Sequence, residues 1–93
     1  MLKVEYTGQF KKDYKLAVKR NYNLDELFEV IRMLSDEKKL PDKYRDHALT
    51  NYAKGNNVRE CHIKPDWLLI YKVYSDRLVL ELLRTGTHSD LFK

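Results

Sequence analysis

The fold is decided by the stretch from Val58 to Arg84, which reads VRECHIKPDWLLIYKVYSDRLVLELLR. Three segments rich in apolar and aromatic residues are separated there by two turn signals, Pro65-Asp66 and Ser75-Asp76. Proline presets the φ angle of a turn, and aspartate and serine side chains satisfy backbone groups within it. The stretch therefore predicts three consecutive strands that pair antiparallel.

The middle segment, Trp67 to Tyr74, is apolar or aromatic at almost every position. This pattern predicts a central strand that is covered on both faces. The preceding segment alternates, so that one of its faces is expected to meet solvent or a ligand. The two faces consist of Val58, Glu60 and His62, and of Arg59, Cys61 and Ile63.

The residues before this stretch predict a further strand and two helices. Leu2 to Tyr6 alternates with the period of a half-buried strand, and Thr7 is placed to cap a helix that runs to about Arg20. Asn23 followed by Glu26 resembles a capping box for a second helix that ends near residue 37. The apolar positions expected to be buried are Phe10, Tyr14, Ala17 and Val18 in the first helix and Leu24, Leu27, Phe28, Ile31 and Leu34 in the second.

The predicted fold class is therefore α+β, with the order β-α-α-β-β-β. The sheet is expected to have four strands, mainly antiparallel, with the helical hairpin on one face. The 93 residues are enough for one domain, spanning residues 1–93, with a single modest core.

Composition limits the functional classes. The formal charge of +4 and the pI near 9.2 favour polyanionic partners without identifying one. The single cysteine, Cys61, excludes an intrachain disulfide, and its position in a strand favours a packed residue over a nucleophile. Neither a signal peptide nor an apolar run of the roughly 20 residues needed to span a membrane is present, so we expect a cytoplasmic protein without membrane contact.

A basic stripe is expected on the first helix, opposite its apolar side. Its members are Lys11, Lys12, Lys15 and Lys19. The stripe suits either a solvated helix face or a surface that follows nucleic-acid phosphates, and the sequence leaves both readings open.

Three histidines lie in parts of the chain that the fold is expected to bring together. His47 belongs to a segment of about 20 residues, 38–57, that shows no period, and loops of that length are usually functional or wrongly assigned. His62 ends a strand and faces Asp66 across the turn, and His88 follows Thr87, which is placed to cap a short C-terminal helical turn. Each histidine alone is more typical of a surface or hydrogen-bonding residue.

Two kinds of chemistry fit the histidines poorly. No histidine pair has the short spacing of common zinc sites, and the single cysteine adds no support, so no metal is expected. Cys61 and His62 are adjacent in a strand and point to opposite faces, so they are not expected to form a nucleophile pair.

General acid-base cleavage of an RNA phosphodiester fits them better. The 2′-OH must lose a proton and the 5′-oxygen must gain one, and histidine can perform either transfer, each worth roughly 10²- to 10⁴-fold. Arg84 or Arg59 is a candidate for stabilising the developing charge. Trp67 and Phe92 are candidates for stacking a base, although core packing is the more common role for Trp67.

Four sequence blocks resemble the YafQ-like branch of the RelE/ParE toxin superfamily, the bacterial toxins of toxin–antitoxin pairs. The blocks are YTGQFKKD from Tyr6, DHAL from Asp46, RECHIKPDWLLIY from Arg59 and RTGTHSDLF from Arg84. Together they cover nearly the whole chain, and the last two are specific to this branch.

The resemblance implies a RelE-like fold and cleavage of messenger RNA in the ribosomal A site, without metal or other cofactor. The implied partners are the ribosome with its 16S ribosomal RNA, messenger RNA, and a cognate antitoxin whose disordered, acidic segment wraps the toxin. The positions that match the family's active site are His47, His62, Asp66, His88 and Phe92, and Glu60 stands where the family carries an acidic residue.

The loop of residues 51–57 departs from this branch: the glycine that often follows the His-x-Leu element does not come directly after Leu49, and Gly55 comes only later, so codon preference is expected to differ. Two alternatives stay open at this point. One is a non-catalytic toxin like the ParE branch, which binds DNA gyrase, and the other is an RNA- or protein-binding module of the same fold. The three histidines argue against both.

The sequence also suggests which histidine accepts a proton and which donates one. His88 is expected beside Arg84 and at a helix N-terminus, two neighbours that favour a neutral imidazole and the role of base. His62 is expected to have Glu60 nearby and to pair with Asp66, and these carboxylates favour the imidazolium and the role of acid. His47 is expected to orient groups or stabilise charge.

Overall fold

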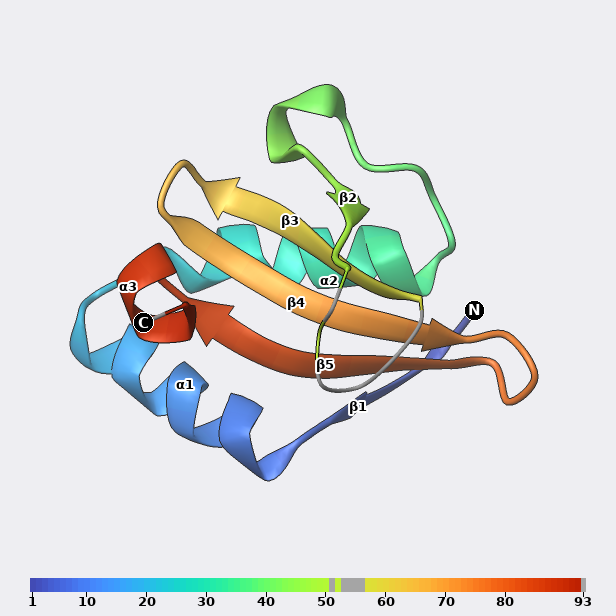
Figure 1. Cartoon of the computed structure of the whole chain (residues 1–93), viewed down its shortest axis with the longest axis horizontal. Helices are drawn as coiled ribbons and strands as arrows, with labels where there is room; N and C mark the ends of the chain where they lie inside the picture. The colour runs from blue at the N-terminus through green and yellow to red at the C-terminus, as the bar shows by residue number, and fades with distance from the viewer. Residues whose placement is uncertain (51, 53–56, 93) are drawn as a thin grey trace.

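The computed structural model describes residues 1–50, 52 and 57–92, and it confirms the α+β fold (Figure 1). Its elements in chain order are β1 (Lys3–Tyr6), α1 (Gly8–Lys19), α2 (Leu24–Ser35), the 3₁₀ helix η1 (Asp42–Tyr44), β2 (His47–Ala48), β3 (Val58–Lys64), β4 (Trp67–Tyr74), β5 (Val79–Gly86) and α3 (His88–Leu91). The loop predicted to influence codon preference lies largely outside the described residues.

The sheet of the described residues has five strands in the order β1-β5-β4-β3-β2, not the four expected. The additional strand is β2, whose two residues pair antiparallel with β3, His47 opposite Glu60 and Ala48 opposite Arg59. A two-residue strand has no sequence period, which is why the pattern did not reveal it. β4 is central, as predicted, and β1 pairs parallel with β5 (Figure 1).

Both helices of the hairpin pack on one face of the sheet, as predicted. The main core joins Phe10 and Ala17 of α1 and Leu27 and Val30 of α2 to the sheet residues Cys61, Leu69, Tyr71, Leu80 and Leu82. The thiol of Cys61 is fully buried, and this burial raises its pKa, which fits the predicted packing role. Among the described residues, the opposite face carries a smaller cluster around Val58, Ile70 and Leu83.

The helix starts are partly as predicted. Thr7 caps α1, because its hydroxyl accepts a hydrogen bond of 3.0 Å from the backbone N–H of Phe10. The prediction of a capping box at the start of α2 is wrong. The Asn23 side chain makes no capping hydrogen bond, and the Glu26 carboxylate instead pairs with Lys64 at 2.8 Å.

Two apolar residues predicted to be buried are exposed, Val18 to 46% and Phe28 to 49%. Each lies on the flank of its helix beyond the stripe that contacts the sheet. Helical spacing alone does not set how wide a stripe the sheet covers.

The C-terminal helix α3 is capped as predicted and is also tied to α1. Thr87 and Asp90 form a reciprocal capping box, and Asp90 accepts a hydrogen bond of 2.7 Å from Arg20. The Arg20 guanidinium and the Thr87 backbone N–H lower the pKa of the Asp90 carboxyl well below its usual range. A side chain at Gly86 would crowd Asp90, since a Cβ there would lie 3.0 Å from the Asp90 Cβ. These contacts fix the position of His88.

Within the described ranges, no helix is long and apolar enough to span a membrane.

Candidate acid-base site

The site is built on the sheet face that the helical hairpin leaves uncovered. Alternation along β3 directs Cys61 and Ile63 into the helix-side core, so Glu60 and His62 project to the other face, as predicted. The pairing of β2 with β3 then places His47 directly opposite Glu60. The short strand β2 therefore places His47 near His62.

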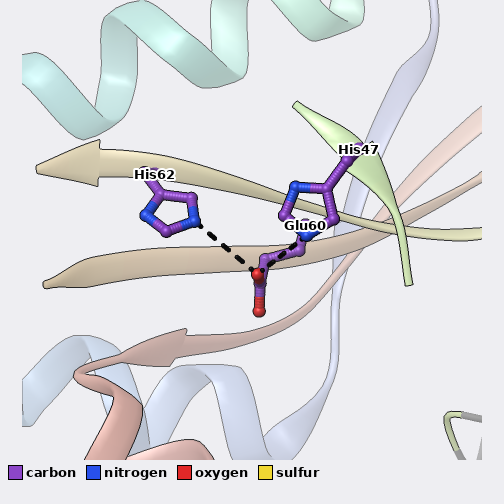
Figure 2. Close-up of side chains that lie close together, drawn as sticks. All are labelled: His47, Glu60 and His62. Carbon is purple, nitrogen blue, oxygen red and sulfur yellow. Dashed lines mark ion pairs between the residues drawn. The ribbon is translucent and has the colours of Figure 1, made fainter. Parts of the chain in front are cut away.

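A buried carboxylate lies between these two histidines (Figure 2). Glu60 is only 5% exposed, and its Oε1 lies 3.2 Å from Nε2 of His47 and 3.8 Å from Nε2 of His62. Its Oε2 is also buried and has no hydrogen-bond partner in the described part of the chain. A buried carboxylate is costly unless it is paired with positive charge.

The other ring nitrogen of each of these histidines faces a backbone carbonyl. Nδ1 of His47 lies 2.7 Å from the Arg45 oxygen, and Nδ1 of His62 lies 3.3 Å from the Pro65 oxygen. A ring with an acceptor near both nitrogens is fully satisfied only when both nitrogens carry protons. Each of the two rings thus has an acceptor oxygen near both of its nitrogens.

His88 completes a row of three rings. The ring centroids of His47 and His62 are 6.0 Å apart, and those of His62 and His88 are 5.7 Å apart. His88 begins α3, directly after β5, and the row therefore draws on three separate parts of the chain. The expectation that the fold gathers the three histidines is met by the structure.

The prediction that Asp66 pairs with His62 is wrong. Asp66 Oδ1 lies 2.6 Å from Nδ1 of His88 and accepts a hydrogen bond of 2.9 Å from its backbone N–H. These two contacts lower the pKa of the Asp66 carboxyl. The turn carries Asp66 away from β3 and toward α3, so its partner comes from the tail of the chain.

His88 thus has a different neighbour from the expected one, and its geometry still fits the predicted role of base. With Nδ1–H donating to Asp66, the neutral tautomer has its lone pair on Nε2, which is the form a general base needs. The expected neighbour Arg84 instead pairs with Asp13. His88 is therefore oriented by a carboxylate and not kept neutral by a cation.

The two arginines proposed to stabilise charge are already neutralised. Arg84 donates to Asp13, whose side chain is 8% exposed, at 2.8 Å, and Arg59 pairs with Asp46 at 3.1 Å. These carboxylates raise the pKa of both guanidinium groups. The two arginines could be identified from the sequence, but the aspartates that the fold places beside them could not.

Of the two residues proposed to stack a base, only one is accessible. Trp67 is 3% exposed, packs on Tyr22 and donates its indole N–H to Thr85, so it is a core residue. Phe92 is 46% exposed at the end of α3, so its side chain is partly accessible to a ligand.

The lysines of the basic stripe, Lys11, Lys12, Lys15 and Lys19, are all exposed on α1. Two further cations escaped sequence analysis, Lys43 and Arg45, which come just before His47. Their only sequence signal is this proximity to a histidine.

The donor set also suits a metal ion. Ligand atoms of His47, Glu60 and His62 all lie within 4.8 Å of one another. Two imidazoles and a carboxylate are typical ligands of zinc, copper and iron. Spacing along the sequence did not indicate this set, because its members come from two paired strands.

The fold and site thus define a small α+β protein with a metal-compatible acid-base centre on the open face of its sheet. Residues 2–93 match the model of a family described as the bacterial toxin of a type II toxin–antitoxin system, YafQ. The chain belongs to this family, as the sequence resemblance indicated.

Individual relatives agree with the family match. The mRNA interferase toxin YafQ of Escherichia coli strain B is 46% identical over 90 residues, which are 96% of this chain and 94% of that protein. The E. coli DinJ–YafQ complex contains a chain with a TM-score of 0.88 and 40% identity, with full coverage of both chains. A metal-bound toxin from Helicobacter pylori gives a TM-score of 0.92 and 41% identity over 99% of this chain and 100% of that one.

Proposed function

We propose that this protein is a ribosome-dependent endoribonuclease that cuts messenger RNA in the A site and so stops translation in the cytoplasm. The observation that carries this proposal is the row of three histidines with two different environments. His88 has its Nδ1 on Asp66, whereas His47 and His62 share Glu60. Relatives at 44% and 46% identity are named mRNA interferase toxins.

The first proton transfer is assigned to His88. Its Nε2 removes the proton from a 2′-OH while Asp66 holds the ring through Nδ1. The 2′-oxygen then forms a bond to phosphorus, and the bond from phosphorus to the 5′-oxygen breaks. Asp66 stabilises the imidazolium that results without taking the proton itself.

The second transfer is assigned to His62. Its imidazolium gives a proton to the departing 5′-oxygen, so the products are a 2′,3′-cyclic phosphate and a 5′-OH. Glu60 Oε1 lies 3.2 Å from Nε2 of His47 and 3.8 Å from Nε2 of His62, so its carboxylate is placed to pair with either ring. His47 stabilises the charge on the phosphorane oxygens, the role first considered for the arginines.

The exposed ring of Phe92 is proposed to stack a base beside the cut, at about 1 to 3 kcal/mol. The lysines of the basic stripe are proposed to dock the toxin on 16S ribosomal RNA. Both features act on binding and not on the proton transfers.

A metal would use the same atoms as the acid side of this mechanism. His47, Glu60 and His62 would hold it, and it would supply Lewis-acid chemistry when bound. The proposed reaction needs His62 as a proton donor and His47 as a charge-stabilising group. A metal bound to His47, Glu60 and His62 would therefore exclude proton transfer by His62.

A cognate antitoxin is the second proposed partner, as in the E. coli DinJ–YafQ complex. An apolar groove of about 680 Å³ lies between β1, α1 and α2, and Phe28 and Tyr6 are exposed beside it. Lys11 and Lys15 line the same groove. An acidic segment with an apolar stripe would fit it, and would cover two lysines of the ribosome-docking stripe.

Product mapping on translated message tests the function. We expect cuts within codons at the A site, a 2′,3′-cyclic phosphate at one new end and a 5′-OH at the other. A 2′-deoxy substitution at the cut position should block cleavage. An intact message with translation unaffected would point to a non-catalytic toxin of the ParE kind. An intact message with translation still inhibited would point to a binding module of the same fold.

Sulfur in place of the leaving 5′-oxygen tests the two roles. Sulfur leaves without a proton, so the modified substrate should restore cleavage by His62→Ala but not by His88→Ala. Restoration of the His88 variant alone would reverse the assignment.

A further inference from the structure

A polar pocket of about 260 Å³ opens beside His62, outside the row of histidines. It lies between η1, the end of β3 and the start of α2, and its lining includes Lys43, Arg45, His62, Lys64 and Glu26. It therefore adjoins the histidine that we assign as the proton donor. A substrate strand that places its leaving oxygen on His62 would continue into or past this pocket.

The pocket carries positive charge that the fold has not neutralised. Lys64 pairs with Glu26 at 2.8 Å, which accounts for one cation and one anion. In the described part of the chain, Arg45 makes no side-chain ion pair, and the Lys43 ammonium lies over the Tyr44 ring, 5.0 Å from its centroid. Arg59 and Arg84, in contrast, are bound to aspartates.

Arg45 is also fixed relative to the catalytic row. Its backbone oxygen lies 2.7 Å from Nδ1 of His47. Arg45 also ends η1, with a φ of 50° in the left-handed region. This conformation is uncommon for a residue other than glycine, asparagine or aspartate. The backbone of Arg45 is therefore held in place beside Asp46, which pairs with Arg59. This backbone position fixes where the Arg45 side chain begins.

We propose that this pocket binds the first phosphate of the RNA strand on the 3′ side of the cut, with Arg45 as its main ligand and Lys43 as the second. The proposal rests on the proposed function, because the 3′ assignment follows from the role of His62 as donor to the 5′-oxygen. Guanidinium binds phosphate with paired N–H donors, and Arg45 can present such a pair. The pocket would hold the leaving strand in line during the reaction.

The test compares Arg45→Asn with Arg45→Lys and with Lys3→Gln. Asparagine tolerates the left-handed conformation, so Arg45→Asn removes charge with the least disturbance of η1. Lys3→Gln removes an equally exposed charge from β1 at the opposite edge of the sheet. Thermal unfolding of all three variants should match that of the wild type.

Single-turnover cleavage on ribosomes loaded with message supplies the measurement. For Arg45→Asn we expect the half-saturating toxin concentration to rise roughly tenfold, with nearly unchanged rate at saturation and weaker salt dependence. Arg45→Lys should retain most of the affinity, and Lys3→Gln should behave as wild type. If Arg45→Asn saturates and responds to salt as wild type does, the subsite is wrong.

A neutral methylphosphonate at one position of the message locates the contact. Placed at the first phosphate 3′ of the cut, it should weaken wild-type binding but add little to Arg45→Asn, since both changes remove one interaction. A matching loss at the phosphate 5′ of the cut would overturn the orientation. Failure of wild-type toxin to cut the unmodified message would instead refute the proposed function.

Discussion

The two faces of the sheet differ in what their polar groups do. On the helix-covered face, Asp13 is buried and fully used, because it accepts from Arg84 at 2.8 Å and from the Thr85 backbone N–H at 3.1 Å. On the open face, Glu60 is buried as well, yet its Oε2 has no partner among the described residues. A satisfied carboxylate secures a helix to a strand. An unsatisfied one keeps charge available to its neighbours, at a cost in stability.

The comparison predicts that side chains of the open face govern cleavage and those of the covered face govern stability. His88→Ala and His62→Ala should each slow single-turnover cleavage on the ribosome by roughly 10²-fold or more. Ribosome binding and the free energy of unfolding should stay close to those of wild type. A large loss of stability in either variant would break the distinction between the faces.

Copper binding should block His62 reversibly and so have the same effect on cleavage as its substitution. Cu²⁺ has the highest affinity in the first-row divalent series and should bind His47, Glu60 and His62. It should therefore suppress cleavage, whereas toxin stripped with EDTA and then freed of the chelator should cleave on ribosomes as well as untreated toxin. Spectroscopic titration should show weaker copper binding by Glu60→Gln. Loss of activity in the stripped toxin, restored by adding back a metal, would mean that a metal takes part in the reaction.

Leu69→Ala tests the covered face. Leu69 is fully buried in the main core, so its truncation should lower the free energy of unfolding by about 2 to 5 kcal/mol. Cleavage per folded molecule should be unchanged, as measured after correction for the folded fraction. Denaturant titration supplies the stability, and a changed rate at full folding would connect the core to the chemistry.

The basic stripe belongs to neither face and should affect only docking. Reversal of Lys11, Lys12, Lys15 and Lys19 to glutamate should weaken ribosome binding several-fold and make the remaining binding less sensitive to salt. Reversal of the exposed Lys38 and Lys39 serves as the control. Equal salt dependence in the stripe variant and wild type would leave the stripe as a solvated surface.

The smallest effect is expected for the pair of Asp90 with Arg20. The pKa of Asp90 is lowered from its ordinary value of 3.8, so the pair stabilises the protein above about pH 4 and is lost as the pH falls below it. Asp90→Asn should lower the melting temperature at pH 7 by roughly 4 °C. Between wild type and variant, that difference should shrink in acid, and a constant difference would contradict the assignment.

The sequence predicted most of what depends on neighbours along the chain. The central strand β4, the Thr7 cap and the Thr87 cap follow from periodicity and from local hydrogen bonding, and all three are confirmed. The gathering of the histidines also followed from strand order. The resemblance to a toxin family supplied the function that these patterns alone left open.

The errors concern partners that are distant in sequence. Asp66 faces His62 across a turn in the sequence, but the tail brings His88 closer to it. Arg84 has no acid near it along the chain, yet α1 provides Asp13. The choice among several possible partners for one charge depends on the exact packing of elements, which periodicity does not determine.

The parallel pairing of β1 with β5 also has a consequence for synthesis. Lys3 to Tyr6 bond along Val79 to Leu82, so the first strand is placed only after nearly the whole chain has been made. At 5 to 20 residues per second, the 93 residues take about 5 to 19 s. During that time the nascent chain lacks β5 and His88, which follows it. We expect the sheet to close only after β5 has emerged, which a protease-protection assay on stalled and released chains would reveal.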